Sequence, residues 1–144
     1  LGLENIHKVG AIGKPGYRWQ AKIVDEKGNE VPPGQTGELI VKGPGVMKGY
    51  YNSEAETKKV IKEGWLYTGD MARKDSDGFI YLVDRKKDII ISGGENIFPV
   101  EIEDFLQAHE DIKDVAVIGM PDERLGEIPK AAIQTKPGRA STES

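Results

Sequence analysis

Apolar residues near the middle of the chain form two short runs, and a strongly charged segment separates them. Residues 79–83 (FIYLV) and 89–91 (III) are β-branched or aromatic apart from one leucine, which is typical of strands. The residues between them, 84–88 (DRKKD), are all charged. They cannot all be buried, because an unpaired buried charge is very costly. The pattern therefore predicts two strands with an exposed connection, and charge alone favours a plain solvated loop there.

The first half of the chain alternates short apolar runs with turn residues. Residues 21–25 and 38–42 read as strands joined through glycine, asparagine and proline, which predicts an antiparallel hairpin. Residues 71–74 and 79–83 flank an Asp-Ser-Asp-Gly turn at 75–78 and predict a second hairpin. This half is therefore expected to be rich in β-structure.

One short helix is expected within this β-rich half. Ser53 and Glu56 have the spacing of a capping box, and Gly64 supplies a C-terminal stop, so a helix is predicted over 54–63. The segment 43–49 reads G-x-G-x-x-x-G with no helix directly after it. It is therefore interpreted as a loop and not as a dinucleotide motif.

The pattern changes after the charged segment. Pro99 suits the first position of a helix, and apolar residues follow at helical spacing. The expected buried face of that helix comprises Ile102, Phe105, Leu106 and His109. Residues 115–119 and 131–135 read as strands. A β-rich segment before about residue 85 is thus followed by a segment with both helix and strand.

Composition narrows the possible classes of protein. The chain has 144 residues with a formal charge of −4, which gives no reason to expect nucleic acid or an anionic membrane as partner. No apolar run approaches the length of a membrane span, and no signal segment is evident, so a cytoplasmic location is the default expectation. With no cysteine and two distant histidines, no metal site is predicted. Oligomeric state cannot be read from the sequence.

Four segments in order resemble one known group of enzymes. They are GELIVKGPGVMKGYYN at 37–52, YTGD at 67–70, DRKKD at 84–88 and IISGGENIFPVEIE at 90–103. Together they resemble the carboxy-terminal third of the adenylate-forming (AMP-binding) superfamily. That superfamily includes acyl-CoA synthetases, 4-coumarate-CoA-ligase-like enzymes, luciferases and the adenylation domains of peptide synthetases. The resemblance runs from about Val9 to Pro137, and the wording of the segments is most similar to fatty-acyl or aryl-CoA ligases.

The resemblance implies an α+β fold in two parts. Residues 1–85 would be the β-rich, distorted barrel-like last subdomain of the family's large domain. Residues 86–144 would be a hinge and an incomplete, small α+β carboxy-terminal domain. The family's phosphate loop ending in Pro-Lys-Gly and its terminal P-K-T-x-x-G-K motif are not found, and Lys130 does not match the adenylation lysine. The chain is therefore expected to be an inactive fragment with no certain catalytic residue.

The resemblance also implies a nucleotide-binding pair. Asp70 matches the family aspartate that accepts hydrogen bonds from the ribose hydroxyls, a role that suits an ionised carboxylate because it has only acceptors. Arg85 matches the arginine that contacts the ribose and phosphate region, where a planar, permanently charged donor fits. Without the resemblance, Asp70 would be read as a turn residue.

Three further positions take roles from the same resemblance. Lys87 falls at the family's hinge, where the backbone rotates; its alternative reading is a solvated lysine. Gly93 and Gly94 match a loop whose backbone lines the tunnel for the pantetheine thiol, and glycine permits such close approach. Ser92 lacks the G-x-S-x-G context of a nucleophile, and the loop could otherwise be a plain flexible turn.

The implied activity is that of an AMP-forming acyl-CoA synthetase, an acid–thiol ligase. Such an enzyme converts a carboxylate and ATP, with Mg²⁺, to an acyl-adenylate and then forms a thioester with coenzyme A. The implied partners are thus small molecules, and the acyl group cannot be read from the sequence. Two alternatives stay open: a non-catalytic binding or scaffolding module, and an adenylation domain from another branch, such as a peptide synthetase or an acyl-AMP ligase.

Overall fold

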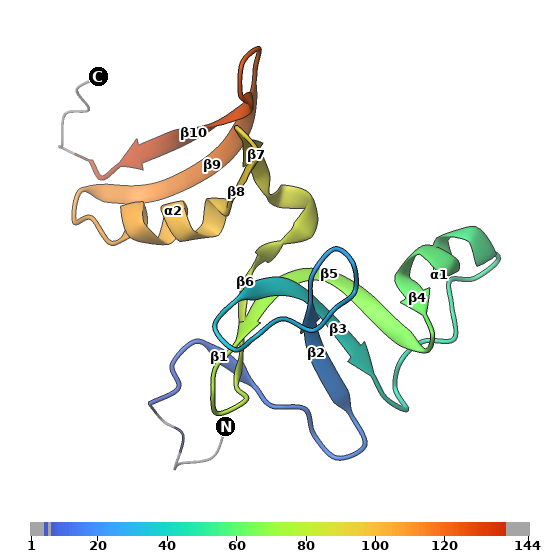
Figure 1. Cartoon of the computed structure of the whole chain (residues 1–144). Helices are drawn as coiled ribbons and strands as arrows, with labels where there is room; N and C mark the ends of the chain where they lie inside the picture. Colours follow the sequence, from blue (N-terminus) through green and yellow to red (C-terminus); the bar gives the residue numbers. More distant parts are fainter. Residues whose placement is uncertain (1–4, 6, 138–144) are drawn as a thin grey trace. The chain divides into compact units, whose positions relative to one another are not determined.

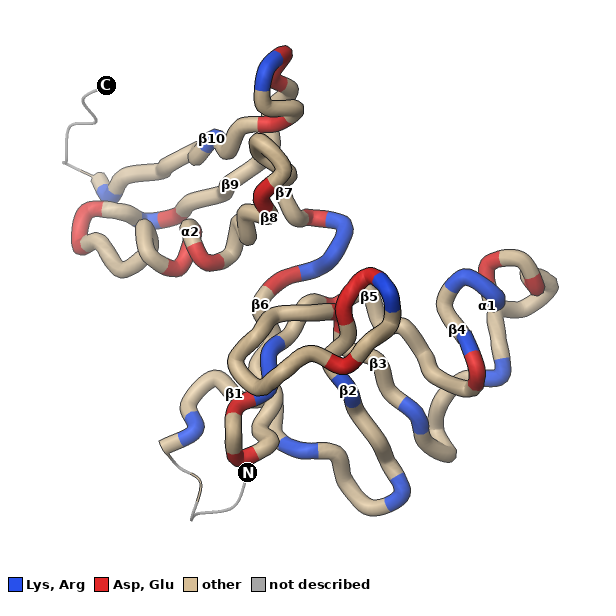
Figure 2. Tube along the Cα trace, in the orientation of Figure 1, with Lys and Arg blue, Asp and Glu red and all other residues tan. Residues whose placement is uncertain are grey.

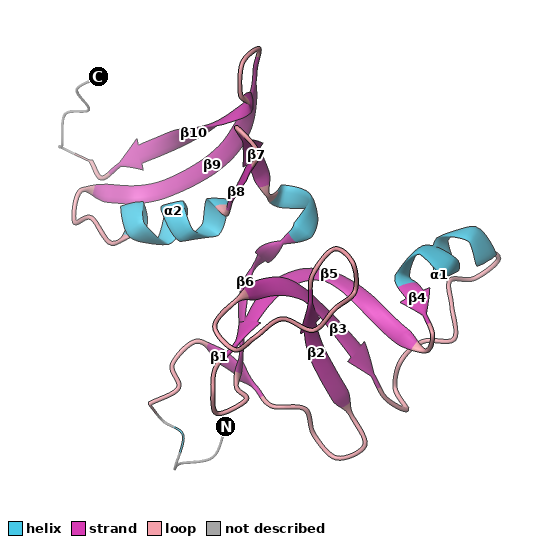
Figure 3. Cartoon of the chain, in the orientation of Figure 1, coloured by secondary structure: helices cyan, strands magenta, loops and turns pink. Residues whose placement is uncertain are grey.

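The computed structural model describes residue 5 and residues 7–137, and the chain divides into two compact units, Leu1–Lys86 and Lys87–Ser144 (Figure 1). Within the described ranges, strands dominate both units, and each unit has one short α-helix (Figure 3). Among the described residues, no helix is long and apolar enough to cross a membrane.

The first unit is built on a six-stranded antiparallel sheet in the order β1-β6-β5-β3-β2, with β4 added beside β5. Its strands are β1 (Ala11–Gly13), β2 (Gln20–Val24), β3 (Thr36–Lys42), β4 (Ile61–Lys62), β5 (Trp65–Lys74) and β6 (Ile80–Arg85). Both predicted hairpins are present, as β2–β3 and β5–β6.

The sheet of the first unit is open. The described end strands β1 and β2 pair with β6 and β3 and not with each other, so the barrel-like character expected from the resemblance does not extend to closure. Closure requires a continuous stagger between neighbouring strands. β1 has only three residues, with a register irregularity between Ala11 and Gly13, and offers little backbone for such pairing.

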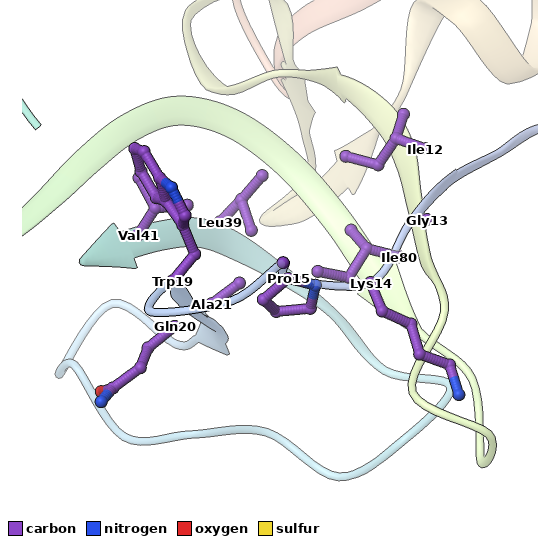
Figure 4. Close-up of a pocket in the computed structure, with 11 residues that line it drawn as sticks. Ile12, Gly13, Lys14, Pro15, Trp19, Gln20, Ala21, Leu39, Val41 and Ile80 are labelled. Atoms are coloured by element: carbon purple, nitrogen blue, oxygen red, sulfur yellow. The ribbon is translucent and has the colours of Figure 1, made fainter. Parts of the chain in front are cut away.

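Several strands of this sheet contribute to a cluster of buried apolar side chains. The cluster comprises Ile23, Val31, Leu39, Ala72 and Ile80. An apolar groove of about 210 Å³ opens beside it, and Figure 4 shows the side chains that line it, among them Trp19, Val41 and Ile12. Asp70 and Arg85 are not among the residues that line this groove.

Gly37 in β3 is required by close approach of the neighbouring strand, since a Cβ there would lie 2.5 Å from the Val24 carbonyl oxygen. We expect Gly37→Ala to lower the free energy of unfolding by about 1–3 kcal/mol, because the backbone must shift to admit the methyl group. Gly16→Ala is the matched control, since nothing lies within 4 Å of a Cβ at that position. Urea unfolding of the two variants measures the difference; equal midpoints would contradict the packing argument.

The helix of the first unit is shorter than predicted. α1 spans Glu54–Val60 and not 54–63, because Ile61 and Lys62 form β4 and pair with Leu66 and Trp65 of β5. Gly64, with φ of 81°, lies in the turn between these two strands and not at the helix end. Hairpin pairing with β5 thus overrides the helix pattern in these residues.

The predicted capping box at the start of α1 is wrong. Ser53 makes no side-chain cap hydrogen bond. Instead the Thr57 hydroxyl donates to the Ser53 carbonyl oxygen at 2.8 Å and accepts from the Tyr50 amide at 2.9 Å. Glu56 forms an ion pair with Lys59. Competing partners within the helix and the preceding loop therefore replace the reciprocal cap.

The turn between β5 and β6 is tied to the segment before β1. Lys8 Nζ lies 2.7 Å from Asp75 Oδ2 and 2.6 Å from Asp77 Oδ2. Asp75 also accepts hydrogen bonds from the Phe79 and Asp77 amides. The hydrogen bond from Lys8, followed by these amides, lowers the pKa of Asp75 from its ordinary 3.8 to about 2. The same two carboxylates raise the pKa of Lys8.

This lowered pKa gives a pH-dependent prediction. A carboxylate with a depressed folded pKa stabilises the fold above its ordinary pKa, and that contribution is lost as pH falls through the folded value. The stability difference between wild type and Lys8→Met should therefore be full above the ordinary value of 3.8 and vanish as pH falls toward about 2. Urea unfolding at several pH values measures it, with exposed Lys48→Met as control. A difference that stays constant with pH would contradict the prediction.

The second unit contains a four-stranded antiparallel sheet in the order β8-β7-β10-β9. Its strands are β7 (Ile90–Ser92), β8 (Glu95–Ile97), β9 (Ile112–Asp122) and β10 (Gly126–Thr135), and α2 spans Pro99–Gln107 against β9. Pro99 occupies the predicted first turn of α2. The strands predicted at 115–119 and 131–135 are present as β9 and β10 but longer than expected, because they pair with each other along nearly their whole length.

The predicted buried face of α2 is only partly correct. Ile102 and Leu106 are half-buried, whereas Phe105 is 80% exposed and His109 lies beyond the helix end. Glu103 takes part in the packing instead, since its carboxylate accepts the Val117 amide of β9 at 2.7 Å. The helical spacing therefore identified part of the face of α2 that packs against β9. The contact with β9 buries only some of the residues on that face.

Candidate functional site

The two residues expected to bind nucleotide are brought together by the first sheet. Asp70 of β5 and Arg85 of β6 are direct cross-strand partners. Arg85 Nε lies 3.4 Å from Asp70 Oδ1, and the two side chains are 60% and 35% exposed. Figure 2 shows the run of charged residues at the end of β6 and after it as adjacent red and blue segments. A solvent-accessible carboxylate and a guanidinium therefore share one edge of the first unit.

Asp70 does not lie in a turn, contrary to the simple reading of Thr-Gly-Asp. The segment is part of the continuous strand β5, and Gly69 adopts a φ of 76°, a left-handed conformation that suits glycine. The pairing with β3 loses its regular register between Glu38 and Ile40, opposite this segment. Such irregularities redirect side chains and are frequent beside functional sites.

The Thr68 hydroxyl stabilises the irregular segment from within. It donates to the Leu39 carbonyl oxygen at 2.8 Å and accepts from the Asp70 amide at 3.1 Å. The backbone of Asp70 is therefore anchored to β3 through one side chain. Thr68 was not singled out from the sequence, although its place within YTGD was a usable signal.

Glu38 is a second residue that sequence reasoning missed. It is 9% exposed, and its two carboxylate oxygens accept from the Gly69 amide at 3.2 Å and from Lys86 Nζ at 2.8 Å. A glutamate inside the otherwise apolar GELIV strand was the available signal. Its partners could not be read from the sequence, because both are remote along the chain.

The geometry of the Asp70–Arg85 pair suits a ribose diol. An ionised carboxylate can accept both hydroxyl protons, and a guanidinium has five donors, so a single Nε contact leaves donors for an anionic group. An exposed ion pair contributes only about 0–1 kcal/mol to stability. A ligand can therefore replace or share this contact at small cost.

The charged segment 84–88, expected as a loop, has regular backbone structure throughout. Asp84 and Arg85 end β6, and Lys86–Asp88 form the 3₁₀ helix η2. Lys87 is exposed within η2, and the division between the two compact units falls between Lys86 and Lys87. The residue predicted to be the hinge is thus the first residue of the second unit.

Gly93 and Gly94 form the tight connection between β7 and β8. Both have positive φ, 58° and 86°. The Gly93 amide donates to the Leu125 carbonyl oxygen at 2.9 Å. A Cβ at Gly93 would lie 3.3 Å from Leu125 Cδ2, whereas nothing lies within 4 Å of one at Gly94. Gly94 therefore offers an open backbone surface, while Gly93 packs on its own unit.

Comparison with known proteins matches two family models to separate parts of the chain. The sequence profile described as AMP-binding enzyme matches residues 2–51, and that of the AMP-binding enzyme C-terminal domain matches residues 101–144. The chain belongs to the AMP-binding enzyme family. This confirms the resemblance and the fold class.

Relatives within the family are CoA ligases. A long-chain-fatty-acid–CoA ligase of Bacillus subtilis (strain 168) is 50% identical over 139 residues, covering 95% of this chain and 25% of the relative. A feruloyl-CoA synthase of an Amycolatopsis species is 44% identical over 136 residues, covering 92% and 28%. The chain thus spans little more than a quarter of the length of these family members.

A solved structure of the family gives the same fold. The o-succinylbenzoate-CoA synthetase of Bacillus subtilis, in complex with its acyl-adenylate intermediate, superposes with a TM-score of 0.87 at 39% identity. The match covers 97% of this chain and 29% of that enzyme. Asp70, Arg85, Lys87, Gly93 and Gly94 lie in the stretch between the two matched family profiles.

Other chemistry finds no support in the part of the chain that the structure describes. Ser92 ends β7 and Lys130 lies within β10 opposite Ile118. Within the described residues, no group of three or more His, Cys, Asp or Glu side chains could hold a metal ion.

Proposed function

We propose that this chain is the nucleotide-contacting and pivoting part of an AMP-forming acyl-CoA synthetase. The parent reaction is activation of a carboxylate by ATP to an acyl-adenylate and pyrophosphate, followed by attack of the coenzyme A thiol to give acyl-CoA and AMP. The observation that carries the proposal is the pairing of Asp70 with Arg85 across β5 and β6 in a member of the AMP-binding enzyme family.

In this proposal each site residue has one role. Asp70 accepts the ribose hydroxyls, and Arg85 contacts the ribose and the phosphate, where its permanent charge offsets that of the nucleotide. Mg²⁺ accompanies ATP through the phosphate oxygens and needs no protein cage. Gly93 and Gly94 line the path of the pantetheine thiol.

In this proposal the change from the first half-reaction to the second depends on movement between the two parts of the chain. Residues 1–85 belong to the large domain and residues 86–144 to the small one, and Lys87 is the backbone pivot between them. Rotation about one or two residues suffices for domain movement when each side packs as a body. The exposure of Lys87 fits this role, since its side chain packs against neither core.

Nucleotide binding tests the proposal on the chain itself. The sequence has neither the Pro-Lys-Gly phosphate loop nor the P-K-T-x-x-G-K motif, so only the ribose contacts remain. We expect AMP to bind with millimolar affinity or worse, about −4 kcal/mol or less favourable, and no acyl-CoA synthesis by the chain alone. Chemical-shift changes at Asp70 and Arg85 during AMP titration measure it, with Asp70→Ala as the control that should lose them. Micromolar binding by calorimetry would contradict this account.

A further inference from the structure

Glu38 occupies an unusual position for a carboxylate. Among the described residues it is the one charged side chain that is buried, with 9% of its surface exposed. It lies in β3, where the residues that follow it are Leu39, Ile40 and Val41. Burial of a charged group is costly unless its oxygens are hydrogen-bonded and its charge is paired. Both conditions are met here, so Glu38 is held in place by specific partners.

The two oxygens of Glu38 reach the two segments that carry the candidate nucleotide pair. Oε1 accepts from the amide of Gly69, which directly precedes Asp70. Oε2 accepts from the ammonium of Lys86, which directly follows Arg85. One side chain of β3 thus fixes the residue next to Asp70 on β5 and the residue next to Arg85 at the end of β6.

The contact with Lys86 also separates two cations. Lys86 and Arg85 are adjacent, and Asp70 is the carboxylate opposite Arg85. Lys86 is half-exposed, with a side-chain exposure of 50%, so without Glu38 its flexible ammonium would be free to seek another carboxylate. A lysine on Asp70 would occupy the acceptor oxygens that a ribose needs, and it lacks the planar donor array of arginine.

We propose that Glu38 is a positioning residue for nucleotide binding. Its hydrogen bond with the Gly69 amide fixes the backbone next to Asp70. Its ion pair with Lys86 keeps that ammonium from binding Asp70, so Arg85 is the cation at the ribose site. The inference rests on the proposed function, because it assigns Glu38 to the same Asp70–Arg85 site. It also gives Lys86 a fixed attachment to the first unit, which places rotation at Lys87 and beyond.

Substitutions at Glu38 and Lys86 separate the two contacts. Glu38→Gln keeps an oxygen for the Gly69 amide but removes the charge that holds Lys86, whereas Glu38→Ala removes both contacts. Lys86→Met removes the cation, and Lys86→Arg preserves it. Glu30→Gln is the matched control, since Glu30 is a paired carboxylate of the same unit that contacts Lys74 and Lys22 instead.

Two readouts on the whole chain test the inference. AMP titration followed by amide chemical shifts should show binding weakened about threefold or more by Glu38→Gln. Binding should be restored toward wild type in the Glu38→Gln/Lys86→Met double variant, because the competing ammonium is then absent and the two substitutions are coupled. Lys86→Arg and Glu30→Gln should bind AMP as wild type does. Amide hydrogen exchange at Gly69 should accelerate in Glu38→Ala and stay slow in Glu38→Gln.

The outcomes distinguish this inference from the proposed function. Wild-type AMP affinity in Glu38→Gln, together with lost binding in Asp70→Ala, would overturn the positioning role and leave the function standing. Wild-type affinity in Asp70→Ala would instead remove the proposed site. Amide exchange needs no nucleotide: unchanged Gly69 exchange in a folded Glu38→Ala variant overturns the inference by itself. If Glu38→Ala does not fold, additive losses in the Glu38→Gln/Lys86→Met double variant overturn it.

Discussion

Asp70→Ala should lower ATP–pyrophosphate exchange by at least about 100-fold, since two hydrogen bonds to a charged acceptor are lost and each contributes about 1.5–3 kcal/mol. The assay requires a complete enzyme. A chimera in which residues 9–137 of this chain replace the matching segment of the B. subtilis o-succinylbenzoate-CoA synthetase supplies one, given the TM-score of 0.87 between the two. Pyrophosphate exchange reports the adenylation half-reaction alone.

Two further variants sharpen this result. Asp70→Asn keeps one acceptor oxygen, so its loss should fall between wild type and Asp70→Ala. Glu26→Ala removes an exposed carboxylate of the same unit and should leave exchange unchanged. Unchanged exchange in Asp70→Ala would remove Asp70 from the ribose site, whatever its distance from Arg85.

Lys87→Pro should slow thioester formation at least about tenfold more than adenylation. Proline fixes φ near −65° and disfavours the helical conformation of the residue before it, which is Lys86 in the 3₁₀ helix η2. If the second unit must rotate about this backbone between the half-reactions, one orientation is trapped. Pyrophosphate exchange and acyl transfer to coenzyme A, measured separately in the same chimera, give the two rates.

Lys87→Ala is the matched control for the hinge. It removes the same charged side chain but leaves the backbone free to rotate, so both half-reactions should proceed nearly as in the unsubstituted chimera. Equal loss of both half-reactions in a folded Lys87→Pro chimera would show that the segment is a static linker. Loss in Lys87→Ala equal to that in Lys87→Pro would assign the effect to the ammonium and not to the backbone.

Glu38 connects these two experiments. Its contact with the Gly69 amide concerns the residue next to Asp70, and its contact with Lys86 concerns the residue next to Lys87. A variant at Glu38 is therefore expected to affect adenylation through Asp70 before it affects thioester formation. Glu38→Gln in the same chimera would show which of the two contacts matters for each half-reaction.

The sequence by itself determined the features that depend on near neighbours in the chain. Short apolar runs at 21–25 and 38–42, with glycine, asparagine and proline between them, predicted the β2–β3 hairpin because both signals are local. Pro99 marked the start of α2 because its fixed φ and missing amide suit the first turn. The order of the four motifs also sufficed to recognise the family, since a motif match requires residue identity and spacing but no contact.

Only the tertiary structure decided which remote residues meet. Pairing with β3 and β6 placed Thr-Gly-Asp inside β5, although the local pattern favoured a turn. The register of β5 and β6 set Asp70 opposite Arg85. The two contacts of Glu38 join two strands, β3 and β5, and the 3₁₀ helix η2 that follows β6. The free energy of such pairings comes from backbone hydrogen bonds and burial over a whole sheet. It therefore cannot be read from a short stretch of sequence.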